Sequence, residues 1–235
     1  MALKERTPIS TGNSRLDRGM GGGLFLDTLT LIEGNARAGK SVISQQLMHG
    51  CLSSGYRLAL FNSESTIKGL VEQMQNLNLD IRDYLLLRRV RIFPVTAPNP
   101  DQNIRAQFMR AVIKEASERG IIFVDSLTSL LSHATQSDVI DLFEEFRRLC
   151  AYGATMVVTM HSHGLNSPLR TYLQSLCDGY FQLRTEDVGG ELVETLEIIK
   201  TRGIEQEEGP IIHFEVEPRR GISVIPTVSR RIGGR

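Results

Sequence analysis

Eight residues have the spacing of a phosphate-binding loop. They satisfy the pattern G-x-x-x-x-G-K-[ST] and read Gly34-Asn35-Ala36-Arg37-Ala38-Gly39-Lys40-Ser41, with Val42 directly after them. The glycines allow the backbone to turn so that its N–H groups point inward, and the positive end of the following helix adds to the attraction for phosphate oxygens. Lys40 is expected to reach the β- and γ-phosphates of a nucleotide, and the Ser41 hydroxyl to bind Mg²⁺.

A carboxylate that could complete a magnesium site follows a second apolar segment. Asp125 comes directly after Ile121–Val124, four consecutive apolar residues typical of a strand buried on both faces. It is therefore expected at the carboxyl edge of the sheet beside the loop, where open α/β sheets bind their ligands. Mg²⁺ prefers such oxygen ligands, so Ser41 and Asp125 are the candidate metal ligands, and ATP with Mg²⁺ is the expected ligand pair.

Hydrolysis would also need a group that orients or deprotonates the attacking water. The residue after Asp125 is Ser126, where many phosphate-loop ATPases have glutamate. Glu64, just beyond the expected second strand, is the nearest substitute. It could equally be a first-turn carboxylate that stabilises its helix, so the residues favour binding of ATP over its turnover.

Strand-like and helix-like segments alternate along most of the chain, which predicts an α/β fold with a mostly parallel central sheet flanked by helices and a β-rich C-terminal third. The predicted helices cover 41–53, 66–77, 102–119 and a segment beginning after Ser137 as its N-cap; the predicted strands cover 28–33, 57–61, 90–93, 121–124, 154–160, 180–183, 192–199, 211–217 and 222–225. Glycine-containing turns at 189–190 and 208–209 are expected to join hairpins. Residues 1–228 are expected to form a single domain, and 229–235 a short basic tail.

Composition excludes several classes of protein. The 235 residues are 41% hydrophobic and 23% charged, which is ordinary globular usage. With 27 basic and 27 acidic residues, no net positive field exists to capture nucleic acid or an acidic membrane. Three cysteines without C-x-x-C spacing do not suggest a disulfide framework or a zinc knuckle. No apolar run approaches the roughly 18 residues of a membrane span, so a cytoplasmic protein is expected, with peripheral docking at the cell membrane still open.

Several motifs together carry a family resemblance. They are Leu16-Asp17 with Gly21-Gly22-Gly23, the loop itself, the strand-end Asp125, and Lys200-Thr-Arg202-Gly203. With them the chain resembles RecA-superfamily ATPases of the KaiC type over nearly its whole length. Local matches at 40–46, 63–66, 158–163 and 175–181 resemble the branch of that group associated with the archaellum, the archaeal flagellum.

The resemblance implies a RecA-like sheet, a ring of six subunits and nucleotide near the subunit boundaries. Lys200 and Arg202 would then reach the γ-phosphate bound by the neighbouring subunit, and His161 would be a candidate γ-phosphate sensor. A metal role for His161 and His163 is the alternative, although no further ligands cluster near them in the sequence. KaiC itself phosphorylates residues near the position of Ser175, so a slow autokinase activity is conceivable.

One departure from the family pattern bears on activity. KaiC-type enzymes commonly place two adjacent glutamates after the second strand, and here the second position is Ser65. The resemblance therefore favours an assembly or regulatory subunit of the archaellum motor with slow or absent hydrolysis, whose partners would be the motor ATPase and a membrane platform protein. The alternatives are a recombinase-like DNA-binding ATPase, with no basic and aromatic loop to support it, and a small-molecule kinase.

Overall fold

The structure is a computed structural model that describes residues 8–95, 102–188, 191–201 and 210–225. Within these ranges the strands form one nine-stranded sheet in the order β3-β2-β4-β5-β1-β6-β7-β8-β9. The strands are β1 Leu29–Gly34, β2 Leu58–Asn62, β3 Val90–Pro94, β4 Ile121–Asp125, β5 Thr155–His161, β6 Gly179–Val188, β7 Glu191–Thr201, β8 Ile211–Glu217 and β9 Gly221–Val224. The α-helices are α1 Ser14–Gly19, α2 Lys40–Ser53, α3 Ile67–Asn76, α4 Arg82–Leu86, α5 Gln102–Arg119, α6 Gln136–Ala151 and α7 Ser167–Leu176, with short 3₁₀ turns η1 Thr128–Leu131 and η2 Ser162–Gly164.

The sheet has a parallel part and an antiparallel part. The neighbouring strands β3, β2, β4, β5, β1 and β6 pair in parallel, so their carboxyl ends meet at one edge. Strands β6 to β9 continue the sheet as antiparallel neighbours. The predicted α/β class with a mostly parallel sheet and a β-rich C-terminal third is confirmed.

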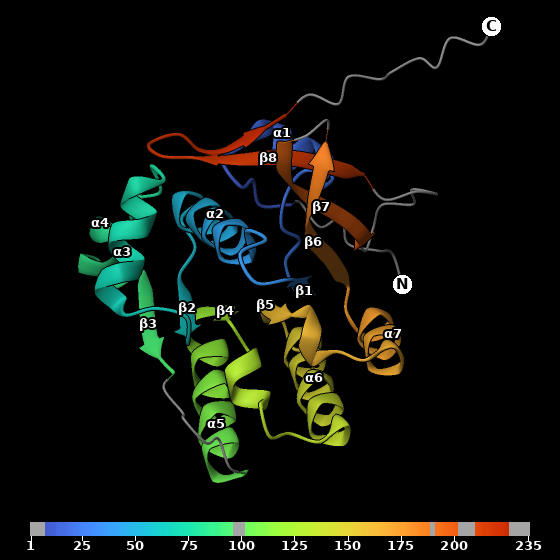
Figure 1. Cartoon of the computed structure of the whole chain (residues 1–235). Coiled ribbons are helices and arrows are strands. Elements are labelled where there is room, and N and C mark those ends of the chain that lie inside the picture. The colour runs from blue at the N-terminus through green and yellow to red at the C-terminus, as the bar shows by residue number, and fades with distance from the viewer. Residues whose placement is uncertain (1–7, 96–101, 189–190, 202–209, 226–235) are drawn as a thin grey trace, which may run out of the picture.

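Helices cover both faces of the parallel strands (Figure 1). Helices α1, α2 and α3 contribute to one buried cluster, and α5, α6 and α7 to the other. Strands β1, β2 and β4 are buried along their whole length, which explains their continuous apolar runs. Among the described residues, no helix is both long and apolar enough to cross a bilayer.

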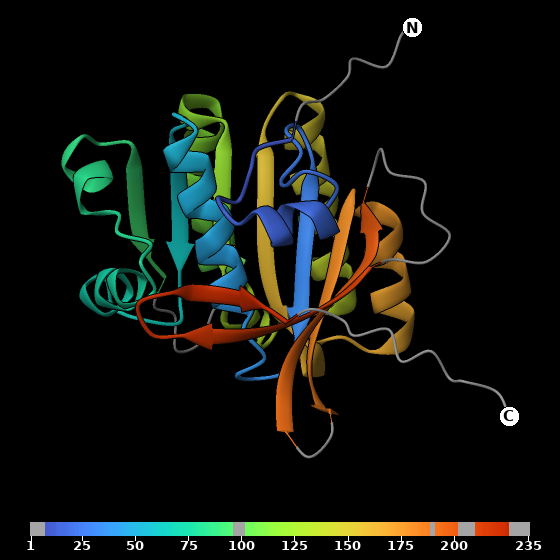
Figure 2. The same cartoon turned by 90° about the horizontal axis from the view of Figure 1, so that it is seen from above.

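The β8–β9 hairpin crosses over α2 and reaches α3 (Figure 2). The backbone N–H of Arg219, in the hairpin turn, donates to the carbonyl of Asn76 at 2.6 Å. Gly221 has a φ of +77°, and a Cβ there would lie 2.8 Å from the carbonyl oxygen of Leu77. This close contact requires glycine, and it places the hairpin over the carboxyl edge of the sheet.

Two features differ from the sequence prediction. Helix α6 has its N-cap at Thr135 and not at Ser137, because Thr135 and Asp138 form a reciprocal capping box. Strand β6 runs to Val188, well beyond the predicted 180–183, whereas β7 exceeds the predicted 192–199 by one residue at its start and two at its end. Arg184, in the added part of β6, forms an ion pair with Glu197 of β7. The predicted turns at 189–190 and 208–209 lie outside the described residues, as does the predicted tail at 229–235.

Candidate nucleotide-binding site

The predicted loop lies between β1 and α2, at the carboxyl edge of the parallel strands. A Cβ at Gly34 would lie 2.7 Å from the carbonyl oxygen of Leu183, so only glycine fits there. Gly39 has a φ of +87° and is the N-cap of α2, with no side-chain cap for the first N–H groups of the helix. Those N–H groups are therefore available to an anion.

Lys40 is the first residue of α2, and its ammonium group turns back over the loop. Its Nζ donates to the carbonyl of Asn35 at 2.7 Å and lies 3.4 Å from Nδ1 of His161. Burial lowers the pKa of Lys40, and the nearby carboxylates of Glu64 and Asp125 act in the opposite direction. A phosphate oxygen would be a stronger partner for this ammonium than the neutral groups of Asn35 and His161, because it carries a negative charge.

Ser41 and Asp125 meet as predicted for a metal site. Oγ of Ser41 donates to Oδ1 of Asp125 at 3.2 Å, and Oγ1 of Thr159 donates to the same oxygen at 2.7 Å. Asp125 is buried, and burial raises its pKa, while the hydrogen bonds from Thr159 and Ser41 lower it in part. A buried carboxylate beside a hydroxyl is a set of hard oxygen ligands, and these residues fit Mg²⁺.

Glu64 lies over the same site and is held by a residue from a neighbouring strand end. Oγ of Ser126 donates to Oε1 of Glu64 at 2.5 Å. Oγ of Ser63 in turn donates to the carbonyl of Ser126 at 2.9 Å. Ser65, at the second carboxylate position of the family pattern, accepts a hydrogen bond from Nδ2 of Asn62 at 3.1 Å instead. One carboxylate therefore faces the site from this segment.

His161 ends β5 and joins Lys40 and Glu64. Its Nε2 lies 3.8 Å from Oε1 of Glu64, and its ring lies 5.3 Å from that of His163. Burial lowers the pKa of His161, as does the Lys40 ammonium, so the neutral ring is favoured. Among the described residues, no group of three or more His, Cys, Asp or Glu side chains has the arrangement of a metal site.

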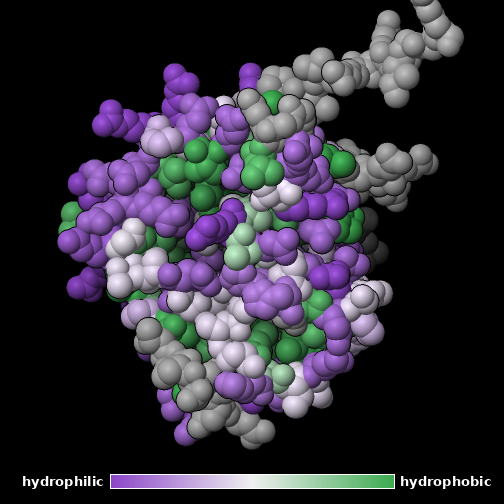
Figure 3. All heavy atoms as spheres, in the orientation of Figure 1, coloured by the Kyte–Doolittle hydropathy of each residue, from purple (hydrophilic) through white to green (hydrophobic). Residues whose placement is uncertain are grey.

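Two hollows meet above these residues. The first has a volume of about 240 Å³ and is lined by Arg37, Gly39, Lys40, Ser41, Val42, Glu64, Gln73, Asp125, Ser126 and His161. The second has a volume of about 650 Å³, lies between α3 and the β8–β9 hairpin, and is lined by Val42, Gly69, Glu72, Gln73, Asn76, Leu77, Val216, Pro218 and Arg219. Val42 and Gln73 belong to both. The same face of the molecule, seen in Figure 3, carries hydrophobic areas beside hydrophilic ones.

The second hollow was not expected from the sequence. Gln73, Asn76 and Arg219 occur in no short motif, and the hairpin reaches α3 only because the sheet continues past β6. The sequence marks Ser126 only as the residue that stands where many phosphate-loop ATPases have glutamate. Its hydrogen bond to Glu64 depends on the alignment of β2 with β4.

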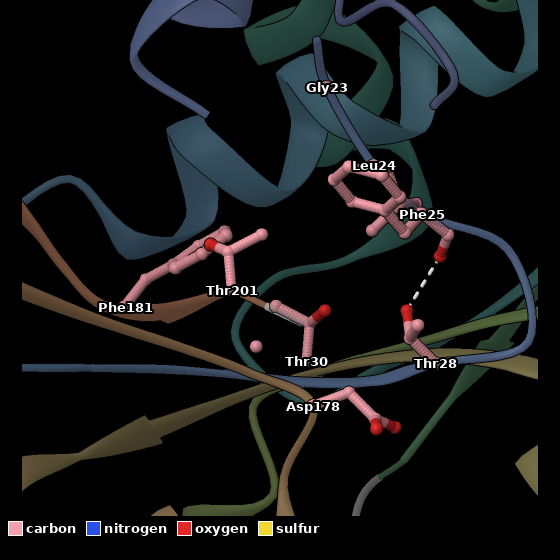
Figure 4. Close-up of a pocket in the computed structure, with 9 residues that line it drawn as sticks. Gly23, Leu24, Phe25, Thr28, Thr30, Asp178, Phe181 and Thr201 are labelled. Carbon is pink, nitrogen blue, oxygen red and sulfur yellow. Dashed lines mark hydrogen bonds between the residues drawn. The ribbon is translucent and has the colours of Figure 1, made fainter. Parts of the chain in front are cut away.

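A third hollow lies away from these residues, at the start of β6 (Figure 4). Thr30, Phe181 and Thr201 line it, and the Thr28 hydroxyl beside it donates to the carbonyl of Phe25 at 2.6 Å. Its volume is about 10 Å³, which is room for one water molecule. It cannot hold a nucleotide.

Lys200 does not join the loop of its own chain. It pairs with Tyr180 near the start of β6, and its Nζ donates to the carbonyls of Gln174 and Ser175 at 2.9 and 3.1 Å. These carbonyls belong to the last turn of α7, on the face of the sheet opposite α2. Arg202 lies outside the described residues.

The fold and this site define a class of protein: an α/β protein with a glycine-rich phosphate loop between the first strand of its parallel sheet and the following helix. The chain belongs to the KaiC family of ATPases, whose family model matches residues 9–229. This result confirms the resemblance inferred from the motifs.

Relatives within the family narrow the resemblance further. The chain is 28% identical over 222 residues to the archaeal flagellar ATP-binding protein FlaH of Sulfolobus acidocaldarius, covering 93% of this chain and 96% of that protein. It is 26% identical to the circadian clock oscillator protein KaiC of Parathermosynechococcus lividus, covering 89% of this chain but 40% of that longer protein. The crystal structure of the flagellar accessory protein FlaH from Methanocaldococcus jannaschii superposes with a TM-score of 0.79 at 27% identity, over 94% of this chain and 100% of that chain.

Proposed function

We propose that this chain binds ATP and Mg²⁺ and acts as a nucleotide-dependent assembly or regulatory subunit of the archaellum motor, with slow or absent hydrolysis. The observation that carries the proposal is the meeting of Lys40, Ser41 and Asp125 at the mouth of one hollow. The N–H groups at the start of α2 and the Lys40 ammonium would hold the phosphates. Ser41 and Asp125 would hold Mg²⁺, which offsets phosphate charge when bound.

The second hollow supports a place for the rest of the nucleotide. It adjoins the phosphate site through Val42 and Gln73, and its walls combine apolar groups such as Leu77 and Val216 with polar ones such as Asn76. A mostly apolar cleft with a few polar groups suits a planar base and a ribose. The adenosine part of ATP would therefore lie between α3 and the β8–β9 hairpin.

Slow turnover is supported by the surroundings of Glu64. One of its carboxylate oxygens already accepts the Ser126 hydroxyl, so that oxygen is less available to orient an attacking water molecule. The family's second carboxylate is replaced by Ser65. Retained ATP could then favour one assembly state, because a ligand shifts an equilibrium only by binding one state better than another.

The names of the FlaH relatives support the flagellar context, and the resemblance supports the motor ATPase and a membrane platform protein as partners at the cytoplasmic face of the membrane. A hexameric ring is part of the same proposal.

The test compares retained nucleotide with phosphate release over several hours, for the wild type, Lys40→Ala and Lys68→Ala. Lys68 is an exposed lysine of α3 in a surface ion pair, and it controls for the loss of one positive charge. We expect the wild type and Lys68→Ala to retain ATP with little phosphate release, and Lys40→Ala to retain none. Rapid multiple turnover by the wild type would contradict the proposed slow hydrolysis, and equal retention by Lys40→Ala would contradict the site.

A further inference from the structure

Glu33 is a fully buried carboxylate that the site described above does not use. It is the penultimate residue of β1, directly before Gly34, and its exposed fraction is 0%. Burial of an unpaired charge is strongly unfavourable, so a carboxylate at this position requires a compensating partner. The partner comes from α7.

Arg170 of α7 binds this carboxylate with both arms of its guanidinium group. Its Nε donates to Oε1 and Oε2 of Glu33 at 3.0 and 3.1 Å, and its Nη2 lies 2.9 Å from Oε1. The hydroxyl of the buried Tyr180, on β6, donates to Oε2. The contact with Glu33 raises the pKa of Arg170, and burial together with Glu33 raises that of Tyr180.

The same guanidinium group also reaches the segment that follows His161. Its Nη2 lies 3.4 Å from the carbonyl oxygens of Ser162, the first residue of η2, and Leu165, directly after it. Arg170 therefore connects β1, the strand directly before the phosphate loop, with η2, the turn directly after His161. In the chain, Lys40 comes after the first of these two points and His161 directly before the second, and Nζ of Lys40 lies 3.4 Å from Nδ1 of His161.

Stability alone does not explain this arrangement. Well-packed apolar side chains are often as stabilising as a buried ion pair, because the pair must first be removed from water. What the planar guanidinium fork adds is direction, since its donors are fixed relative to one another. A fixed direction is useful where two loops must keep a defined separation.

We propose that Glu33, Arg170 and Tyr180 form a positioning unit that holds the phosphate loop and His161 at the separation needed to distinguish ATP from ADP. This inference rests on the proposed function, because it assumes that the γ-phosphate contacts both Lys40 and His161. Arg170 is a positioning residue, since it acts through Glu33 and the His161 segment without contacting the nucleotide.

The test is Arg170→Lys, which keeps the positive charge and removes the fork. Binding of Mg-ATP and of Mg-ADP is measured separately by titration calorimetry on the full chain, and the melting temperature is recorded without nucleotide. We expect the ratio of ATP to ADP affinity to fall by about tenfold, the effect of losing roughly one hydrogen bond to a charged group. Affinity for ADP should change little.

The matched control is Arg119→Lys. Arg119 also forms a buried ion pair, with Oε2 of Glu115 at 2.9 Å on α5, and neither residue lines the nucleotide hollows. The same chemical change there should lower the melting temperature without changing the affinity ratio. A fall in the ratio for both variants would show a general effect of destabilisation and would overturn the proposal.

A second variant covers the case in which Arg170→Lys does not fold. The double variant Glu33→Gln/Arg170→Met removes both charges, so no buried charge is left unpaired, and its affinity ratio should also fall. An unchanged ratio in any folded variant of the pair, or a wild type that binds ATP and ADP equally well, would overturn the inference. A wild type that binds neither nucleotide would instead overturn the proposed function.

Discussion

At the scale of single residues, the candidate site buries two side chains that carry opposite charges. Asp125 and Lys40 are both largely buried, and burial raises the pKa of the first and lowers that of the second. Both shifts disfavour the charged forms that Mg²⁺ and phosphate would bind. The free site is therefore less stable than it would be with neutral side chains, and bound nucleotide should stabilise the fold.

The variant Asp125→Asn tests this balance. A carboxyl group whose folded pKa is raised gives stability at low pH that is lost as the pH rises through that pKa. Above that pKa the ionised Asp125 therefore costs stability, and the amide, which still accepts both hydroxyl hydrogen bonds, should raise the nucleotide-free melting temperature there by roughly 2–5 °C. Mg-ATP should then stabilise the variant less than it stabilises the wild type.

The difference between the two nucleotide-free proteins should shrink as the pH falls through the raised pKa of the wild-type carboxyl, which takes up its proton above the ordinary value of 3.8. Differential scanning calorimetry measures both effects. Asp141→Asn, the same change at an exposed position of α6, should leave the melting temperature almost unchanged. A nucleotide-free Asp125→Asn variant that melts at a lower temperature than the wild type would show that the buried carboxylate does not destabilise the fold.

At the scale of elements, local hydrogen bonds decide where the helices around the site begin. Helix α6 starts at the capping box of Thr135 and Asp138, in which each side chain accepts from the backbone N–H of the other. Helix α3 begins similarly after Thr66, whose Oγ1 accepts from the N–H of Gly69 at 3.1 Å. These caps set the ends of helices that pack beside the strand ends of the site.

Substitutions at the start of α6 should separate the two candidate caps. Thr135→Ala should lower the free energy of unfolding by about 1 kcal/mol, because it removes an acceptor for the N–H of Asp138. Ser137→Ala, two residues later, should change it by less than about 0.5 kcal/mol. Urea denaturation followed by circular dichroism measures both. A larger loss of unfolding free energy for Ser137→Ala than for Thr135→Ala would indicate that Ser137 is the cap.

At the scale of the whole molecule, Lys200 is separated from the phosphate loop of its own chain. It lies on the α7 face near the start of β6, whereas the loop opens at the carboxyl edge beside α2. A contact with γ-phosphate would therefore have to be made to another copy of the chain. In this structure its ammonium instead binds the last carbonyls of α7, where a positive charge suits the helix dipole.

Lys200→Ala should therefore weaken self-association in Mg-ATP at least about tenfold, the effect of losing one charged hydrogen bond, while changing nucleotide retention much less. Arg202→Ala is predicted to behave in the same way. Light scattering with and without ATP gives the mass, and filter retention of labelled ATP gives the binding. Lys68→Ala serves as the surface control. An unchanged mass for Lys200→Ala in ATP would contradict a role between subunits.

Much of the site could be predicted because its chemistry is local in sequence. The loop needs glycines, a lysine and a serine within eight residues, and the apolar run 121–124 marks the strand that Asp125 ends. The central strands are buried along their whole length, and their runs of apolar residues therefore predict them from the sequence. The full length of β6 was harder to predict, because half-exposed charged residues such as Arg184 and Glu186 follow its apolar start.

The sequence by itself determined the class of protein, the glycine-rich loop and the Ser41–Asp125 pair that we propose as Mg²⁺ ligands, because backbone turns and strand ends depend on neighbouring residues. Only the tertiary structure decided which distant groups meet: Glu64 with Ser126, Arg170 with Glu33, and the hairpin turn at Arg219 with α3. Such contacts depend on strand order and on which face each side chain occupies. Neither property can be read from spacing along the chain, since segments far apart in sequence become neighbours only when the sheet forms.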